Sequence, residues 1–141
     1  MAIEAALFDV LKDDAGVGTV CGDRIYPLLA PDNAVKPYIV YEVIGTEPQR
    51  ITAGAGTLKR TRMHLDCYDE GASGYGDAKS LADAVRTAID NARGTWDSGG
   101  SNETTIRRCF IDDETDGLTN PADGGDVPTF RRILSVTIWH L

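Results

Sequence analysis

The chain has 141 residues, of which 42% are hydrophobic and 26% charged, and its formal net charge at pH 7 is −8. This length and composition fit one folded domain over residues 1–141 and exclude an extensively disordered protein. The acidic charge argues against a broad phosphate-binding surface, so specific nucleic-acid binding is not expected. There is no apolar run of the ~20 residues that a membrane span needs, and the acidic start is unlike a secretory signal, so we expect synthesis in the cytoplasm without export.

The first predicted element is an amphipathic helix from Ala2 to Asp14. Gly16 and Gly18 are expected to end this helix. The stretch that follows, residues 21–34, contains two prolines and is expected to be irregular or briefly extended. The helix would bury one apolar stripe, whose members recur at three- and four-residue steps: Ile3, Ala6, Leu7, Val10 and Leu11.

Two strands are predicted next, Pro37 to Thr46 and Leu58 to Tyr68. The first is rich in β-branched and aromatic residues on both faces, which is typical of a central strand. The second alternates between an apolar and a polar side. Residues 47–57 between them offer little to pack around, so we expect a long mobile hairpin loop there. The two sides of the second strand are Met63, Leu65 and Cys67 against Arg60, Arg62, His64 and Asp66.

The second half of the chain predicts one more helix and two more strands. The helix spans residues 74–92, with an apolar stripe of Tyr75, Ala78, Leu81, Ala82, Val85 and Ile89. A flexible linker over residues 94–102 is expected to lead to strands Thr104 to Asp112 and Thr129 to His140. The expected element order is therefore α-β-β-α-β-β. Such an order predicts a single α+β domain in which helices pack on one face of an antiparallel or mixed sheet.

Catalytic chemistry is hard to assemble from this sequence. The histidines are His64, inside a predicted strand, and His140, next to the end, and no nucleophile motif accompanies them. The cysteines Cys21, Cys67 and Cys109 are odd in number and widely spaced, which favours buried thiols over disulfides or zinc. The glycine-rich stretch before Lys59 lacks the ending of a phosphate loop. We expect no enzyme and no cofactor.

An acidic segment partly matches a calcium-binding loop. Asp112, Glu114, Asp116 and Asp123 fall at positions 1, 3, 5 and 12 of the motif, with Gly117 at position 6. The expected setting between two strands and the short final Asp favour a solvated turn instead. A calcium-dependent binding module stays open as an alternative function.

Four arginines form two basic pairs, Arg107 with Arg108 and Arg131 with Arg132, on the last two predicted strands. Because side chains alternate between the two faces of a strand, the two arginines of a pair lie on opposite faces. At most one arginine from each pair can therefore lie on a given face of the sheet. Nearby acids are numerous, so ion pairs within or between subunits are favoured over a phosphate site.

The ordered combination of segments resembles the tail-completion proteins of long-tailed phages, which are related to the tail terminators that cap the tail tube. The resemblance covers nearly the whole chain, although residues 94–102 and 112–126 are long for the family. It rests on GDRIYPLLAP (22–31), KPYIVYEVIG (36–45), RTRMHLDCYD (60–69), AKSLADAVRTAID (78–90) and RRILSVTIWH (131–140).

This resemblance implies a structural virion protein without catalytic residues. It implies a homo-oligomer, a hexameric ring, at the head-proximal end of the tail, with the tail tube protein and a neck or stopper protein as partners and DNA only passing through the bore. A neck adaptor or stopper is the alternative within the same class. A closed ring needs two different side surfaces on each subunit, and the candidate interface residues are Gln49, Arg50, Arg60, Arg62, His64 and Asp66.

Overall fold

The computed structural model describes residues 2–31, 34–51, 54–70, 74–90, 92–96, 99, 103–119 and 129–141. This part of the chain forms a mixed α+β domain, which confirms the predicted fold class. Its element order differs from the prediction because the short helix Ala15–Cys21 and the short strand Gly94–Trp96 were not expected, whereas the short strand Ile25–Pro27 lies in the stretch predicted to be irregular or briefly extended. The elements are α1 Ala2–Asp13, α2 Ala15–Cys21, β1 Ile25–Pro27, β2 Tyr38–Ile51, β3 Gly54–Glu70, α3 Gly74–Asp90, β4 Gly94–Trp96, β5 Thr104–Thr119 and β6 Thr129–His140.

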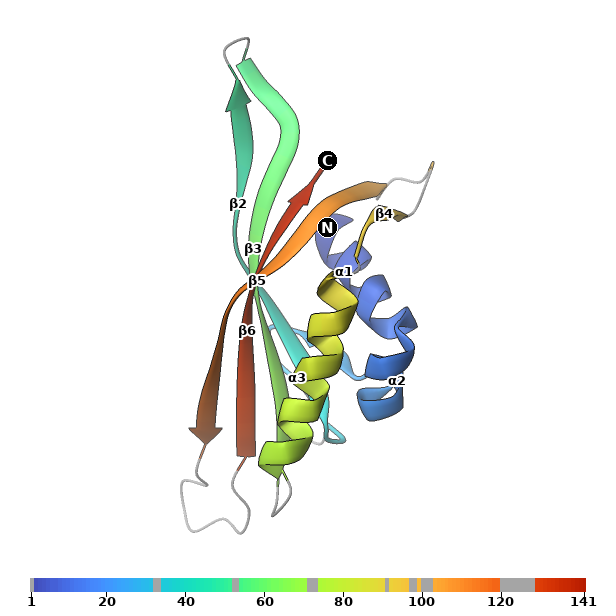
Figure 1. Ribbon diagram of the computed structural model, residues 1–141, viewed down its shortest axis with the longest axis vertical. Helices are drawn as coiled ribbons and strands as arrows, with labels where there is room; N and C mark the ends of the chain where they lie inside the picture. Colours follow the sequence, from blue (N-terminus) through green and yellow to red (C-terminus); the bar gives the residue numbers. More distant parts are fainter. Residues whose placement is uncertain are drawn as a thin grey trace.

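The strands form one six-stranded sheet in the order β1-β2-β3-β6-β5-β4. The short strand β1 runs parallel to β2, and every other neighbouring pair is antiparallel. The sheet is therefore mixed, as the sequence allowed. Figure 1 shows its long central strands twisting strongly across one another, with α3 lying along them and α1 and α2 beside α3. Among the described residues, no helix has both the length and the apolar character that crossing a bilayer requires.

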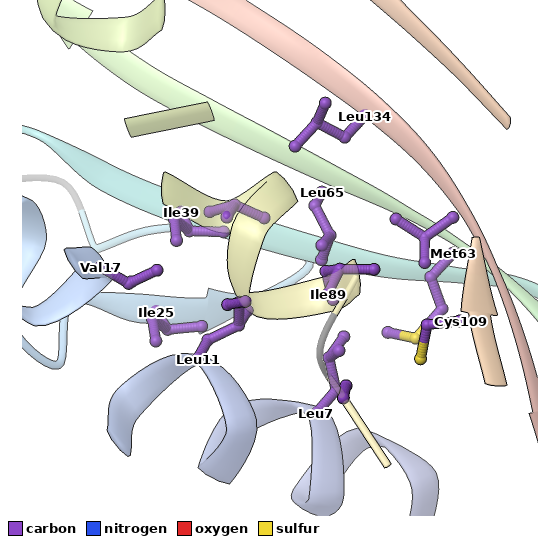
Figure 2. Packing of buried hydrophobic residues seen from close by; sticks show 14 of the residues in the cluster. Leu7, Leu11, Val17, Ile25, Ile39, Met63, Leu65, Ile89, Cys109 and Leu134 are labelled. Atoms are coloured by element: carbon purple, nitrogen blue, oxygen red, sulfur yellow. The ribbon is translucent and has the colours of Figure 1, made fainter. Parts of the chain in front are cut away.

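The hydrophobic core lies between α3 and one side of the long strands. Met63, Leu65 and Cys67 of β3 are fully buried, as their alternation predicted. They face the apolar stripe of α3, with α1 and α2 closing the core (Figure 2). Burying each large side chain contributes about 1.5–3 kcal/mol, so this layer is the main source of stability. The stripe of α3 was predicted well except for Tyr75, which is 48% exposed.

The prediction that Gly16 and Gly18 end the helical region is wrong, because both glycines lie within α2. Asp14 separates the two helices, and its Oδ1 accepts a hydrogen bond of 3.0 Å from the backbone N–H of Val17. Such a cap stabilises a helix by about 1 kcal/mol. Val17 and Cys21 are buried on the new helix. The cap and this burial together offset the intrinsic cost of two glycines.

Three stretches predicted to be loop or linker contain strand instead. Strand β2 continues to Ile51 and β3 already begins at Gly54, so residues 47–51 and 54–57 are not a loop. The linker expected over residues 94–102 opens with β4. Strand β5 continues into the acidic segment as far as Thr119, and residues 120–126 of that segment lie outside the described part of the chain. In each case pairing with a neighbouring strand satisfies backbone groups that composition alone assigned to solvent.

Candidate assembly surfaces

The β2–β3 hairpin projects beyond the helices as an arm, defined here as residues 45–62 (Figure 1). Pairing of β3 with β6 ends at Lys59 opposite His140, whereas β2 and β3 stay paired as far as Ile51 opposite Gly54. The arm carries four basic residues and one acidic residue, while the remainder of the chain carries 10 basic and 21 acidic residues. The arm is thus a basic projection from an acidic protein.

The predicted interface residues divide between this arm and the body of the sheet. Gln49 and Arg50 lie on β2 near the end of the arm, beyond the last pairing of β3 with β6. Arg60 and Arg62 stand at its base, where both approach Glu47: Nη2 of Arg60 donates to Oε2 at 2.6 Å, and Nη2 of Arg62 lies 4.0 Å from Oε1. One carboxylate therefore faces two guanidinium groups.

His64 and Asp66 continue the polar side of β3 into the body of the sheet. His64 lies opposite Glu42 on β2 and Ser135 on β6. Asp66 lies 3.9 Å from Nη1 of Arg131. The structure thus brings Arg60, Arg62, His64 and Asp66 to one side of β3, as the alternation predicted. Their role in an interface stays a prediction.

The Asp66–Arg131 pair is incompletely satisfied within the chain. Oδ1 of Asp66 and Nε of Arg131 are both buried, and neither has a hydrogen-bond partner among the described residues. Burial raises the pKa of Asp66, while the positive charge of Arg131 acts in the opposite direction. Buried polar atoms without partners cost stability, so this pair is a place where an added hydrogen-bonding group would be favourable.

Aromatic side chains extend this polar side of the sheet toward β1. The rings of Tyr38 and Tyr68 stack with centroids 5.1 Å apart, and Tyr26 meets Tyr38 edge to face at 5.9 Å. Tyr68 lies opposite Arg131 on β6. Each such ring pair contributes about 0.5–1.5 kcal/mol beyond burial. The row therefore helps to stabilise the pairing of strands at this end of the sheet.

The acidic segment predicted as a possible calcium loop lies largely in strand β5. Glu114 accepts hydrogen bonds from Arg132, at 3.1 Å, and from Arg86 of α3. Asp116 accepts hydrogen bonds from Arg132 and, at 3.1 Å, from Tyr75 of α3. We call these five residues the α3 clamp, because they join α3 to β5 and β6.

The electrostatics of the α3 clamp agree with a structural role. Burial alone would raise the pKa of Glu114, but hydrogen bonds and charges of Arg132 and Arg86 bring it below its ordinary value. A hydrogen bond from Arg132 also lowers the pKa of Asp116. Both carboxylates are therefore paired with arginine side chains.

The other two residues of the calcium motif lie elsewhere. Asp112 accepts a hydrogen bond from the Thr137 hydroxyl, and Asp123 lies outside the described residues. No cluster of three potential metal ligands occurs in the described part of the chain. The prediction of ion pairs is confirmed for Arg131 and Arg132, whereas Arg108 stacks on Phe110, with its guanidinium 4.6 Å from the ring centroid.

Four of the side chains considered for catalysis, the three cysteines and His140, are buried, whereas His64 is partly buried. Cys21, Cys67 and Cys109 are free, buried thiols, as predicted, and burial raises the pKa of each, that of Cys109 to about 12. A thiol is a poor nucleophile under these conditions. His140 Nε2 lies 2.7 Å from the hydroxyl of buried Thr61, and burial lowers the pKa of this histidine. These residues pack the core and its margin.

Hollows on the surface of the described part of the chain were not predicted from the sequence. A cavity of about 390 Å³ is lined by Glu4, Pro27, Leu28, Tyr41 and Val43. A second, of about 260 Å³, lies between the end of α1 and the end of α3 and includes Asp9, Asp13, Asp14 and Arg93. Their residues come from distant parts of the chain, and no local motif unites them.

Comparison with known proteins gives one family and one fold. The family model described as tail completion protein gp17 matches residues 5–139. A solved structure titled as the virion of a native gene transfer agent particle contains a similar chain, with 16% identity and a TM-score of 0.62, covering 98% of this chain and 95% of that one. At this identity the likeness shows a shared fold. No curated protein matches the sequence.

Proposed function

The chain belongs to the tail completion protein gp17 family of structural phage-tail proteins, and from this premise we propose that it forms a hexameric ring capping the head-proximal end of the tail tube. In that position the ring joins the tube to the neck proteins. The family match over residues 5–139 is the observation that carries this proposal. The similar fold found in a gene transfer agent virion also supports it.

Ring closure requires that each subunit present two different, mutually complementary surfaces, since such a heterologous contact repeats from copy to copy. The chain offers two regions of opposite character. One is the basic arm, with Gln49, Arg50, Arg60 and Arg62. The other is the acidic body, where His64 and Asp66 extend the polar side of β3. We take these residues as parts of the contacts between subunits or with the tube.

DNA passes through the proposed ring without a dedicated site. The body of each copy carries an excess of 11 negative charges outside the arm. Acids facing the bore would repel the phosphate backbone weakly and keep DNA from adhering. The proposed role is mechanical and structural, because the cysteines are buried and His140 is held against Thr61.

Assembly of particles with and without this chain tests the proposal. Tails made in its absence should lack a terminated end and fail to join heads, and adding the purified chain should restore both, as seen by negative-stain electron microscopy. Light scattering of the purified chain over a range of concentration and salt should show the mass of a closed ring. Normal, joined tails in its absence would reject the proposal. A chain found on the portal side would identify a neck adaptor or stopper instead.

A further inference from the structure

The cavity beside α1 has the composition of a site for a long basic side chain. Its apolar walls are Pro27, Leu28 and Val43, and its polar groups come from Glu4 and Tyr41. Lysine and arginine bury their aliphatic stems against apolar surface while their charged ends meet an acceptor. The cavity supplies both kinds of contact within about 390 Å³.

Glu4 provides an acceptor that the chain leaves unused. Its Oε2 atom is buried and has no hydrogen-bond partner among the described residues. Burial raises the pKa of the neighbouring Tyr41, and the Glu4 carboxylate adds to this effect. A buried carboxylate oxygen without a donor is costly, and a cation that donates a hydrogen bond removes much of this cost. A positively charged hydrogen-bond donor would therefore satisfy Oε2 of Glu4.

The rim of the cavity is apolar and held in an unusual backbone conformation. Leu28 has a φ of 61°, in the left-handed region that non-glycine residues seldom adopt. A hydrogen bond of 2.9 Å from its backbone N–H to the carbonyl of Tyr41 fixes it beside β2. Leu28 is 72% exposed, and Leu29, which follows it in the chain, is 80% exposed. Exposed apolar side chains at and beside a cavity are typical of a protein contact.

We propose that this cavity receives the side chain of Arg50 from the arm of a second copy of the chain. The proposal rests on the ring proposed above and assigns one contact within it. Charge complementarity supports it, because the arm is basic while the body is acidic and holds the unsatisfied carboxylate.

Distance along β2 makes this contact one between copies. Val43 lines the cavity, and Arg50 lies seven residues further along the same strand. At about 3.3 Å per residue the separation is roughly 20 Å, well beyond the length of an arginine side chain. Each copy therefore offers one arm and one cavity that cannot meet each other. Arm-to-cavity contacts repeated around a symmetry axis would close a ring.

Matched variants test the contact by light scattering at several concentrations. Glu4→Gln removes the negative charge with little change in shape, and Arg50→Gln removes the cation. Each should weaken self-association at least thirty-fold, roughly the loss expected when one member of a buried interfacial charge pair is removed. Lys59→Gln is the control, because Lys59 also lies on the arm but stands opposite His140 in the body. It should assemble like the unmodified chain.

Mixing the two defective variants gives a sharper result. Glu4→Gln keeps a functional arm and Arg50→Gln keeps a functional cavity, so an equal mixture should form a one-to-one heterodimer that neither variant forms alone. Equal assembly of both variants and the unmodified chain would overturn the contact while leaving the ring intact. An unmodified chain that is monomeric at every concentration would also overturn it, and the particle assay would then judge the capping function separately. Loss of tail incorporation by Glu4→Gln with unchanged self-association would assign the cavity to another partner.

Discussion

Strand β3 passes through two regions that differ in what surrounds them. In the body, residues 63–67 are paired on both sides and covered on one side by α3, and Met63 and Leu65 are fully buried. In the outer arm, residues 54–58 lie beyond the pairing with β6, and Gly54 and Ala55 pair with β2. A two-stranded hairpin is at best marginally stable alone. The comparison teaches that the body supplies folding energy and the arm depends on the body, which leaves its surface available for assembly.

The largest difference between the two regions should appear when the same substitution is made in each. Leu65→Ala removes a fully buried side chain beneath α3 and should lower the free energy of unfolding by about 3 kcal/mol. Leu58→Ala, on the same strand within the arm, should cost less than about 1 kcal/mol because Leu58 is only partly buried. Urea unfolding followed by circular dichroism measures both. Equal losses would show that the arm shares the core.

The junction between arm and body should respond next. The buried hydroxyl of Thr61 lies 2.9 Å from that of Thr46 and 2.7 Å from His140 Nε2. Thr61→Val leaves both groups without this partner and should cost about 2 kcal/mol. Thr61→Ser keeps the hydroxyl and should cost less than about 1 kcal/mol. Thermal unfolding of the pair separates loss of the hydrogen bonds from loss of packing.

The α3 clamp should give stability to the body in a pH-dependent manner. The folded pKa of Glu114 is below its ordinary value of 4.5, so its contribution is present above that pH and is lost as the pH falls through the folded pKa. Glu114→Gln should therefore cost about 1–2 kcal/mol near neutral pH and much less in strong acid. Unfolding measured at both pH values tests this. A cost independent of pH would contradict the assignment.

The smallest effect on stability should come from the exposed ion pairs of the arm. Glu47 is 57% exposed and faces Arg60 and Arg62. Glu47→Gln should change the free energy of unfolding by less than about 0.5 kcal/mol. The same variant frees two guanidinium groups and should change the salt dependence of self-association. Light scattering at low and high salt tests this effect. An unchanged salt dependence would show that Glu47 does not influence the contacts between copies.

The sequence was sufficient to predict those helices and strands in which buried residues recur at regular intervals. The stripe of α3, the alternation of β3 and the bounds of β6 could be predicted because each buries regularly spaced residues where it packs against the core. The outer arm could not, because small residues such as Ala55 resemble a loop in composition. Only backbone pairing, which leaves no mark on residue type, makes this stretch a strand.

For the candidate sites, too, groupings within one strand could be predicted, whereas contacts between residues far apart in the sequence could not. Alternation placed Arg60, Arg62, His64 and Asp66 on one side of β3. The acidic segment was misassigned as loop because its partners, Arg86 and Tyr75, lie on a helix far away in the sequence. The Glu4 cavity was missed for the same reason, since its walls come from α1, β1 and β2 and the turn after β1.

The twelve register pairs between β3 and β6 give the arm a mechanical property. Hydrogen bonds in an antiparallel ladder run perpendicular to the strands. A pull on the arm along its own axis therefore loads these bonds together, in shear, whereas a sideways pull would open them one after another. A protein built in this way resists axial tension far better than peeling, so the direction in which a neighbour tugs on the arm determines whether the joint holds.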